Sequence, residues 1–145
     1  MYSIYGTYED SVGQLIAGYF SRAVDRKVIP PYSAIGWVEN KDSPIIVGQA
    51  VFVDYTGSNI EVHLNIPGKF SRRVIRNVYG YAFKQLKCNR LTAKVALHNQ
   101  NLLQLLPRLG FEYECLMQAY YGEPEAPVDA LVYKLTKNNA LKWLQ

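Results

Sequence analysis

Hydrophobic residues along the chain follow two periods, one of two residues and one of three to four. A period of two marks a strand with one buried face, and the longer period marks one side of a helix. The segments expected to be strands are residues 2–5, 34–39, 45–55, 60–66, 91–97, 111–121 and 128–135. The segments expected to be helices are residues 10–24, 74–86, 99–108 and 138–144. The second of these helices carries an apolar stripe and is expected to be about 15 residues long.

The order of these segments is β-α-β-β-β-α-β-α-β-β-α, with glycines and prolines punctuating the connections. Three consecutive strands followed by a β-α-β unit indicate a mixed sheet with helices on its faces. The expected fold class is therefore α/β (α+β). A length of 145 residues, without a repeat or a linker, fits a single domain spanning residues 1–145.

Composition places the chain among folded globular proteins and limits the kinds of partner that it is expected to bind. Hydrophobic residues make up 49% of the chain and charged residues 19%. The two cysteines have no metal-ligand spacing, no apolar run is long enough to span a membrane, and the start lacks a signal-peptide pattern. We therefore expect a cytoplasmic protein with no metal and no membrane partner. The net charge of +4 suits nucleic acid, a phosphorylated cofactor, or solubility alone.

Three stretches of sequence resemble one known superfamily. The first comprises residues 34–40, 47–54 and 59–64 and contains Gly48, a glycine within a strand. The second is Tyr-Ala-Phe-Lys-Gln-Leu-Lys-Cys-Asn-Arg-Leu-Thr-Ala-Lys-Val, residues 81–95. The third is Asn99, which stands twelve residues before the Phe of Leu109-Gly110-Phe111. Over residues 33–136 the chain resembles the GNAT N-acetyltransferases, and within them the ribosomal-protein (RimJ/RimL-like) branch.

The resemblance implies a mostly antiparallel sheet of six or seven strands, flanked by helices, whose central parallel strands splay apart. It also implies acetyl-CoA as co-substrate, with its pantetheine arm pairing to the exposed backbone between those strands. The residues that match this edge are Leu64, Asn65 and Ile66. Asn99 matches a family residue that contacts the pantetheine, and the same side chain also suits the N-cap of the following helix.

The family binds the pyrophosphate on a glycine-rich loop that opens the long helix, where free backbone N–H groups and the helix dipole favour an anion. The corresponding stretch here, residues 67–73, keeps a single glycine and appears several residues short. Cations crowd the first helical turn, and Ser71 suits its N-cap. We expect these cations to replace missing backbone donors, whereas the alternative is a solvated basic face. The residues assigned to the phosphate are Gly68, Lys69, Ser71, Arg72 and Arg73.

The best candidates for a catalytic base share one face of the strand predicted at residues 60–66. Glu61 stands where the family often places a carboxylate that acts through water. His63 lies two residues further on, and an unperturbed histidine, with a pKa near ~6.5, suits proton removal near neutral pH. The alternatives are a carboxylate on a solvated face and a hydrogen-bonded structural histidine.

The family's general acid, a tyrosine, is replaced by Leu106. The proton for the leaving thiolate of CoA would then come from Tyr113, Tyr120 or bulk water. The acceptor site of the resembled fold corresponds to residues 10–25 and 120–128, where Glu123 and Glu125 offer an attraction for a cationic amine.

The leading hypothesis is thus an acetyl-CoA-dependent N-acetyltransferase that moves acetyl directly to an amine of a protein or small molecule. One alternative is a catalytically inactive GNAT-fold protein used for interaction or structure, for example in a viral particle. Another is a nucleic-acid binder that uses the basic residues between positions 69 and 90, although no recognised motif is present. The sequence leaves the acceptor and the oligomeric state open.

Overall fold

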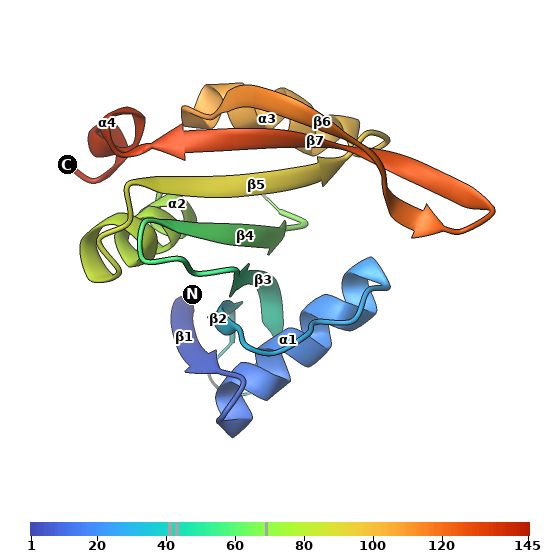
Figure 1. Ribbon diagram of the computed structural model, residues 1–145. Coiled ribbons are helices and arrows are strands. Elements are labelled where there is room, and N and C mark those ends of the chain that lie inside the picture. Colours follow the sequence, from blue (N-terminus) through green and yellow to red (C-terminus); the bar gives the residue numbers. More distant parts are fainter. Residues whose placement is uncertain (41, 43, 69) are drawn as a thin grey trace.

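The computed structural model describes residues 1–40, 42, 44–68 and 70–145. Within them the chain forms one seven-stranded sheet in the order β1-β2-β3-β4-β5-β7-β6 (Figure 1). The strands are β1 (Tyr2–Thr7), β2 (Ser33–Val38), β3 (Ile46–Val53), β4 (Asn59–Asn65), β5 (Arg90–Ala96), β6 (Glu112–Glu123) and β7 (Ala126–Thr136). Neighbouring strands are antiparallel except for β4 and β5, which are parallel. The predicted class and the predicted order of elements are both confirmed.

One face of the first strands is covered by α1 (Ser11–Val24), which crosses β1, β2 and β3 (Figure 1). Asp10 caps its start by accepting a hydrogen bond from the Gly13 amide at 2.8 Å. Ile16 and Phe20 are buried against Val51 and its neighbours on the sheet. Gly13 lies so close to the Thr7 backbone that a Cβ there would overlap it, which lets the helix begin directly against β1.

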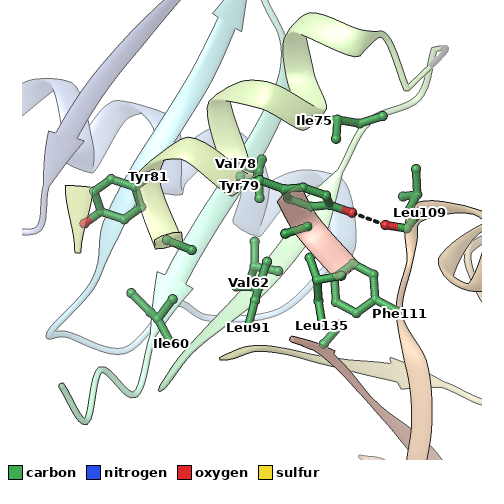
Figure 2. Close-up of a cluster of buried hydrophobic side chains, with 14 of the residues drawn as sticks. Ile60, Val62, Ile75, Val78, Tyr79, Tyr81, Leu91, Leu109, Phe111 and Leu135 are labelled. Carbon is green, nitrogen blue, oxygen red and sulfur yellow. Dashed lines mark hydrogen bonds between the residues drawn. The ribbon is translucent and has the colours of Figure 1, made fainter. Parts of the chain in front are cut away.

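The opposite face is covered by α2 (Arg72–Tyr79) and by a π-helical turn, η1 (Gly80–Gln85). Figure 2 shows their apolar side chains meeting those of β4, β5 and β7, among them Val62, Leu91 and Leu135. The helix predicted at about 15 residues is present, but its second half is wider than an α-helix, with the Leu86 amide bonded to the Tyr81 carbonyl. Such a short stretch contains too few apolar positions for their spacing to reveal the change of pitch.

The remaining helices follow β5 and β7. They are α3 (Gln100–Leu105), the 3-10 turn η2 (Leu106–Leu109), α4 (Lys137–Ala140) and the 3-10 turn η3 (Leu141–Trp143). Pro107 stands in η2, which explains the tighter turn at the end of this predicted helix. Gly110 then ends it with a φ of 98°, in the left-handed region that favours glycine.

The strands β4 and β5 pair over only a short length. Their register covers Asn59–Arg90, Ile60–Leu91 and Glu61–Thr92, although β4 continues to Asn65 and β5 to Ala96. Each strand stays paired on its other edge, β4 with β3 and β5 with β7, so both remain extended as they diverge. The predicted splay between the central parallel strands is therefore confirmed, and it leaves a wedge in the middle of the sheet.

The last two strands form a hairpin that extends beyond the neighbouring strands (Figure 1). The strands predicted at residues 111–121 and 128–135 reach further toward each other than expected, because pairing continues to Glu123 and Ala126 and leaves a two-residue turn. Register shifts interrupt β6 before this point, and Ala119 adopts a φ of 54°. These irregularities re-aim the tyrosines that follow, a common effect of β-bulges.

A buried hydrogen bond of Tyr79 contributes to the stability of the core that packs on β4 and β5. The Tyr79 hydroxyl donates to the Leu109 carbonyl at 2.8 Å (Figure 2), and burial raises the pKa of this phenol well above its ordinary value. We expect Tyr79→Phe to lower the free energy of unfolding by about 1–2 kcal/mol, because it leaves a buried carbonyl without its donor. Urea denaturation measures this effect. Tyr113→Phe is the matched control, since Tyr113 is 55% exposed, and an equal loss in both variants would contradict the assignment.

Candidate functional site

Two cavities meet at β4. The smaller one, of about 260 Å³, lies in the wedge between the diverging halves of β4 and β5 and is closed by Leu102 and Leu106. The larger one, of about 820 Å³, lies under the connection from α1 to β2 and reaches the start of β4. Arg26, His63 and Tyr121 line both cavities, so the two spaces adjoin at these side chains.

The junction is organised by a buried carboxylate. Glu61 is only 4% exposed, and its side chain accepts from two cationic or proton-bearing groups. Its Oε2 lies 2.6 Å from His63 Nε2, and its Oε1 lies 2.9 Å from Lys94 Nζ. Lys94 follows Thr92, the partner of Glu61 in the last β4–β5 pair, by two residues and therefore shares its face of the sheet. The ion pair thus bridges the strands where their backbone pairing ends.

The same contacts set the protonation of the network. Burial by itself would raise the pKa of Glu61, but hydrogen bonds from His63 and Lys94 lower it below its ordinary value. Burial likewise opposes the charge on Lys94, yet the bond to Glu61 raises the pKa of its ammonium to about 12. Glu61 is therefore an anion at neutral pH, and an anion can only accept. His63 must donate from Nε2, so in the neutral imidazole the lone pair is on Nδ1.

These contacts bear on the alternatives for Glu61 and His63. The interpretation of Glu61 as a carboxylate on a solvated face is wrong, because the side chain is buried. Its two oxygens are already engaged, and its lowered pKa makes it a weak proton acceptor. His63 is hydrogen-bonded, as the structural alternative expects, and its second nitrogen is free of that partner, as a base requires, so both alternatives stay open for it.

Two adjacent tyrosines complete the junction. Tyr120 Oη lies 3.3 Å from Lys94 Nζ, and Tyr121 donates its hydroxyl to the Lys94 carbonyl at 3.2 Å. Burial raises the pKa of Tyr121, so its phenol stays protonated at neutral pH. Sequence reasoning missed Tyr121, because regular alternation would place neighbouring residues on opposite faces. Tyr113 lies elsewhere, exposed against Tyr133, and borders neither cavity, so it is removed from the candidate proton donors.

The end of β5 supplies the other wall of the small cavity. Asn99 accepts from the Leu102 amide at 3.4 Å and so caps α3, and it also lines the cavity. The side chain can therefore cap α3 and face the cavity at the same time, as the two expected roles require. Leu106 is fully buried and offers only hydrocarbon to the same space. The position of the family's general acid thus carries no proton donor.

The stretch between β4 and α2, described at residues 66–68 and 70–71, is more exposed to solvent than the junction around Glu61. Ser71 caps α2 by accepting from the Val74 amide at 3.2 Å, as predicted. Gly68 has free space around it, since a Cβ there would meet no atom within 4 Å. Lys69 lies outside the described residues. On β4 itself, Leu64 packs against the core together with Ile66 beyond it, and Asn65 donates its side-chain amide to Gln49 at 2.8 Å.

The arginines of α2 are exposed and engaged at the surface. Arg72 lies over the Trp143 ring at 5.8 Å, Arg73 donates to the Met1 carbonyl, and Arg76 donates to the Gln145 carbonyl at 2.7 Å. These contacts lie at the solvent-exposed surface, and a phosphate is a stronger acceptor than a backbone carbonyl. The structure therefore brings Glu61, His63, Leu64 and Asn99 around the cavities, and it leaves the cationic residues beyond the C-terminal end of β4.

Two further features concern metal binding and the membrane. Within the described ranges no cluster of three His, Cys, Asp or Glu side chains is arranged to bind a metal ion. Among those same residues, every helix is too short or too polar to cross a bilayer.

Comparison with known proteins was made by sequence and by structure. No protein-family model matches the chain. The sequence is 32% identical over 68 residues to the uncharacterized N-acetyltransferase YoaA of Bacillus subtilis (strain 168), a match that covers 47% of this chain and 38% of that protein. The chain thus spans well under half of the curated relative that it matches.

Solved structures cover far more of the chain. Mutant forms of the spermidine/spermine N-acetyltransferase SpeG from Vibrio cholerae superpose with a TM-score of 0.70 at 12% identity, over 99% of this chain and 100% of that one. A putative acetyltransferase from T. thermophilus gives 0.67 at 19% identity, over 80% and 64%. An acetyltransferase (GNAT family) from Bacillus anthracis gives 0.59 at 18% identity, over 72% and 66%. The RimJ/RimL-like branch stays a prediction, whereas the chain has the fold of the GNAT acetyltransferases.

Proposed function

We propose that the protein is an acetyl-CoA-dependent N-acetyltransferase that transfers the acetyl group directly to an amine. The observation that carries this proposal is the junction of two cavities at an oriented histidine, inside a sheet whose parallel strands diverge. A thioester arm and an acceptor amine can then approach His63 from opposite spaces. The fold of the solved acetyltransferases and the partial match to an N-acetyltransferase support the same conclusion.

The wedge fits the cofactor in its chemistry. The backbone edge of β4 after Glu61 is no longer paired with β5, and an extended amide-bearing arm suits such an edge as an added strand. We assign this contact to Leu64, Asn65 and Ile66, with Asn99 on the opposite wall. The diphosphate is assigned to the start of α2, at Gly68, Ser71, Arg72 and Arg73, and to Lys69 on the sequence alone. Bound there, acetyl-CoA supplies an activated acyl group.

Acetyl transfer requires the acceptor amine to lose a proton as its nitrogen attacks. We assign this proton to Nδ1 of His63. Glu61 holds the ring by its Nε2–H and stabilises the cation that forms, while Lys94 keeps Glu61 ionised. This differs from the expectation of Glu61 as the base, because both its oxygens are occupied and its pKa is lowered.

Tyr121 is the best-placed proton donor to the departing thiolate. It borders both cavities, and burial keeps its phenol protonated. It therefore takes the role that Leu106 cannot fill. Tyr120 holds the neighbouring ammonium of Lys94 and is assigned to positioning.

An inactive interaction protein is the less favoured function. A buried ion pair contributes little to stability by itself, because desolvation offsets the attraction between the charges. The network of Glu61, His63 and Lys94 also lies at the junction of two cavities rather than in a sealed core. Catalysis accounts for this placement, whereas a purely structural role leaves it unexplained. A cytoplasmic location stays a prediction.

The role of His63 is tested by His63→Gln. Glutamine keeps an N–H donor toward Glu61 but has no ring nitrogen to accept a proton. We expect kcat for acetyl transfer to fall about 10²–10³-fold, the usual contribution of a general base, with CoA affinity within twofold. Product formation by mass spectrometry and CoA titration by calorimetry measure the two quantities. The control is His98→Gln at the exposed rim, and a His63→Gln enzyme with near-normal kcat would exclude His63 as the base.

The diphosphate assignment is tested by the double substitution Arg72→Ala/Arg73→Ala. We expect CoA to bind about 10-fold more weakly, or ~1.4 kcal/mol, because charge-assisted hydrogen bonds to the phosphates are lost. The loss should shrink at high salt. Arg108→Ala, which removes an exposed arginine of η2, is the control. Unchanged CoA affinity in the double variant would remove these arginines from the cofactor site.

The ion pair predicts a pH dependence of stability. The folded-state pKa of Glu61 is lowered, so its contribution is complete above the ordinary value near 4.5 and is lost as the pH falls through the lower folded value. We expect Glu61→Gln to destabilise by about 3 kcal/mol at pH 7, because it leaves the half-buried Lys94 ammonium without its carboxylate. Urea denaturation at several pH values should show this difference shrinking below about pH 4. Glu123→Gln on the exposed hairpin is the control, and a constant difference across that range would contradict the assignment.

A further inference from the structure

We infer that the acceptor amine also carries a carboxylate, and that Arg26 binds it. The acceptor would then be an amino acid or a similar amine with a nearby carboxylate. This inference rests on the proposed function, because it names the substrate class of the same site. The inference goes beyond the proposed function because it predicts that polyamines, the substrates named for SpeG, are poor acceptors for this protein.

The backbone of Arg26 is fixed at the end of α1. Asp25 closes the helix in the left-handed conformation, with a φ of 53°. The Arg26 amide donates to the Ser21 carbonyl at 3.2 Å, and Ser21 Oγ donates to the Arg26 carbonyl at 2.6 Å. The residue is therefore held by two local hydrogen bonds, and its side chain leaves from a defined point beside both cavities.

The guanidinium is held between aromatic rings rather than by an acid. Its central carbon lies 4.8 Å from the centre of the Tyr121 ring and 6.0 Å from that of Phe20. In the described part of the chain, no carboxylate forms an ion pair with it. A guanidinium has five N–H donors, so its contact with these rings leaves donors available for a carboxylate.

The position of Arg26 relative to His63 defines the kind of ligand. The ring centre of His63 lies 6.5 Å from that of Phe20, the same ring over which Arg26 stands. Both groups line both cavities. A small molecule can therefore place its amine at His63 and its carboxylate at Arg26. The lining of the larger cavity includes several tyrosine rings, which suit an apolar or aromatic body.

The charges at this junction disfavour a polycation. Glu61 is already balanced by Lys94, and of the two cations that line the larger cavity Arg26 is half-buried, whereas Lys27 is exposed. The other carboxylates of the larger cavity, Glu9 and Asp54, are exposed. A carboxylate on the acceptor balances Arg26, which is half-buried and therefore less screened by solvent than the exposed charges.

An anion at Arg26 has a second conceivable source, the phosphates of the cofactor. We favour the acceptor, because Arg26 also lines the larger cavity, whereas the diphosphate is assigned to the start of α2. The two sources make different predictions, since only one of them alters CoA affinity when Arg26 is changed.

The test compares three amino acids, L-phenylalanine, L-leucine and L-alanine, each with its amide, and adds spermidine. Binding is measured by calorimetry in the presence of CoA, and acetylated product by mass spectrometry with acetyl-CoA. We expect at least one amino acid to bind at least 10-fold more tightly than its amide and more tightly than spermidine. The preference should vanish in Arg26→Gln, be partly kept in Arg26→Lys and be fully kept in Lys27→Gln. CoA affinity should change less than twofold.

The outcomes separate the two proposals. Equal binding of every amino acid and its amide, a preference for spermidine, or an Arg26→Gln effect on CoA alone would each overturn the inference. Acetylation of amides or spermidine with no carboxylate preference would overturn it and leave the acetyltransferase proposal intact. Binding of an amino acid that depends on Arg26, with no acetylated product from any compound, would support the binding site and overturn the proposed catalysis.

Discussion

The ion pair between Glu61 and Lys94 stands where the two parallel strands of the sheet part. Up to Glu61 and Thr92 the two parallel strands are joined by backbone pairing, and beyond them they part. A gap in the middle of a sheet exposes backbone groups that need partners. The structure tolerates it because β3 and β7 still pair with the outer edges, and because the Glu61 carboxylate and Lys94 ammonium link the two strands at the point of divergence.

The same ion pair connects architecture to chemistry. A carboxylate at this depth is costly unless it is neutralised, and Lys94 together with His63 supplies its partners. Once Glu61 is fixed as an anion, the tautomer of His63 follows from which nitrogen faces it. The divergence of the strands then places that histidine between two cavities. Strand geometry, charge and base orientation are consequences of one arrangement, so none of them can be altered without affecting the others.

The sequence predicts those features that depend on local order. Alternation along residues 60–66 places Glu61 and His63 on one face, and the structure confirms it by the bond between them. Lys94 was not predicted, because its contact depends on the register between β4 and β5, which alternation within each strand does not determine. Tyr121 was not predicted, because a bulge and the positive φ of Ala119 interrupt the period of β6. Arg26 lies in a connection that carries no periodic signal at all.

The balance of charges links Lys94 and Arg26, two of the residues that the sequence did not predict. Without a ligand, the junction holds one anion, Glu61, and two cations, Lys94 and Arg26. The first two neutralise each other at 2.9 Å, so the remaining positive charge rests on a guanidinium held between aromatic rings. A cation in that position is less well solvated than one in bulk water, and it attracts whichever anion enters the larger cavity. An amine that brings its own carboxylate satisfies Arg26 and leaves the Glu61–Lys94 pair intact, whereas a polycation adds further positive charge beside it. In the proposed reaction, the site would therefore discriminate between amines by the charge next to the reacting nitrogen, using a residue that takes no part in the transfer itself.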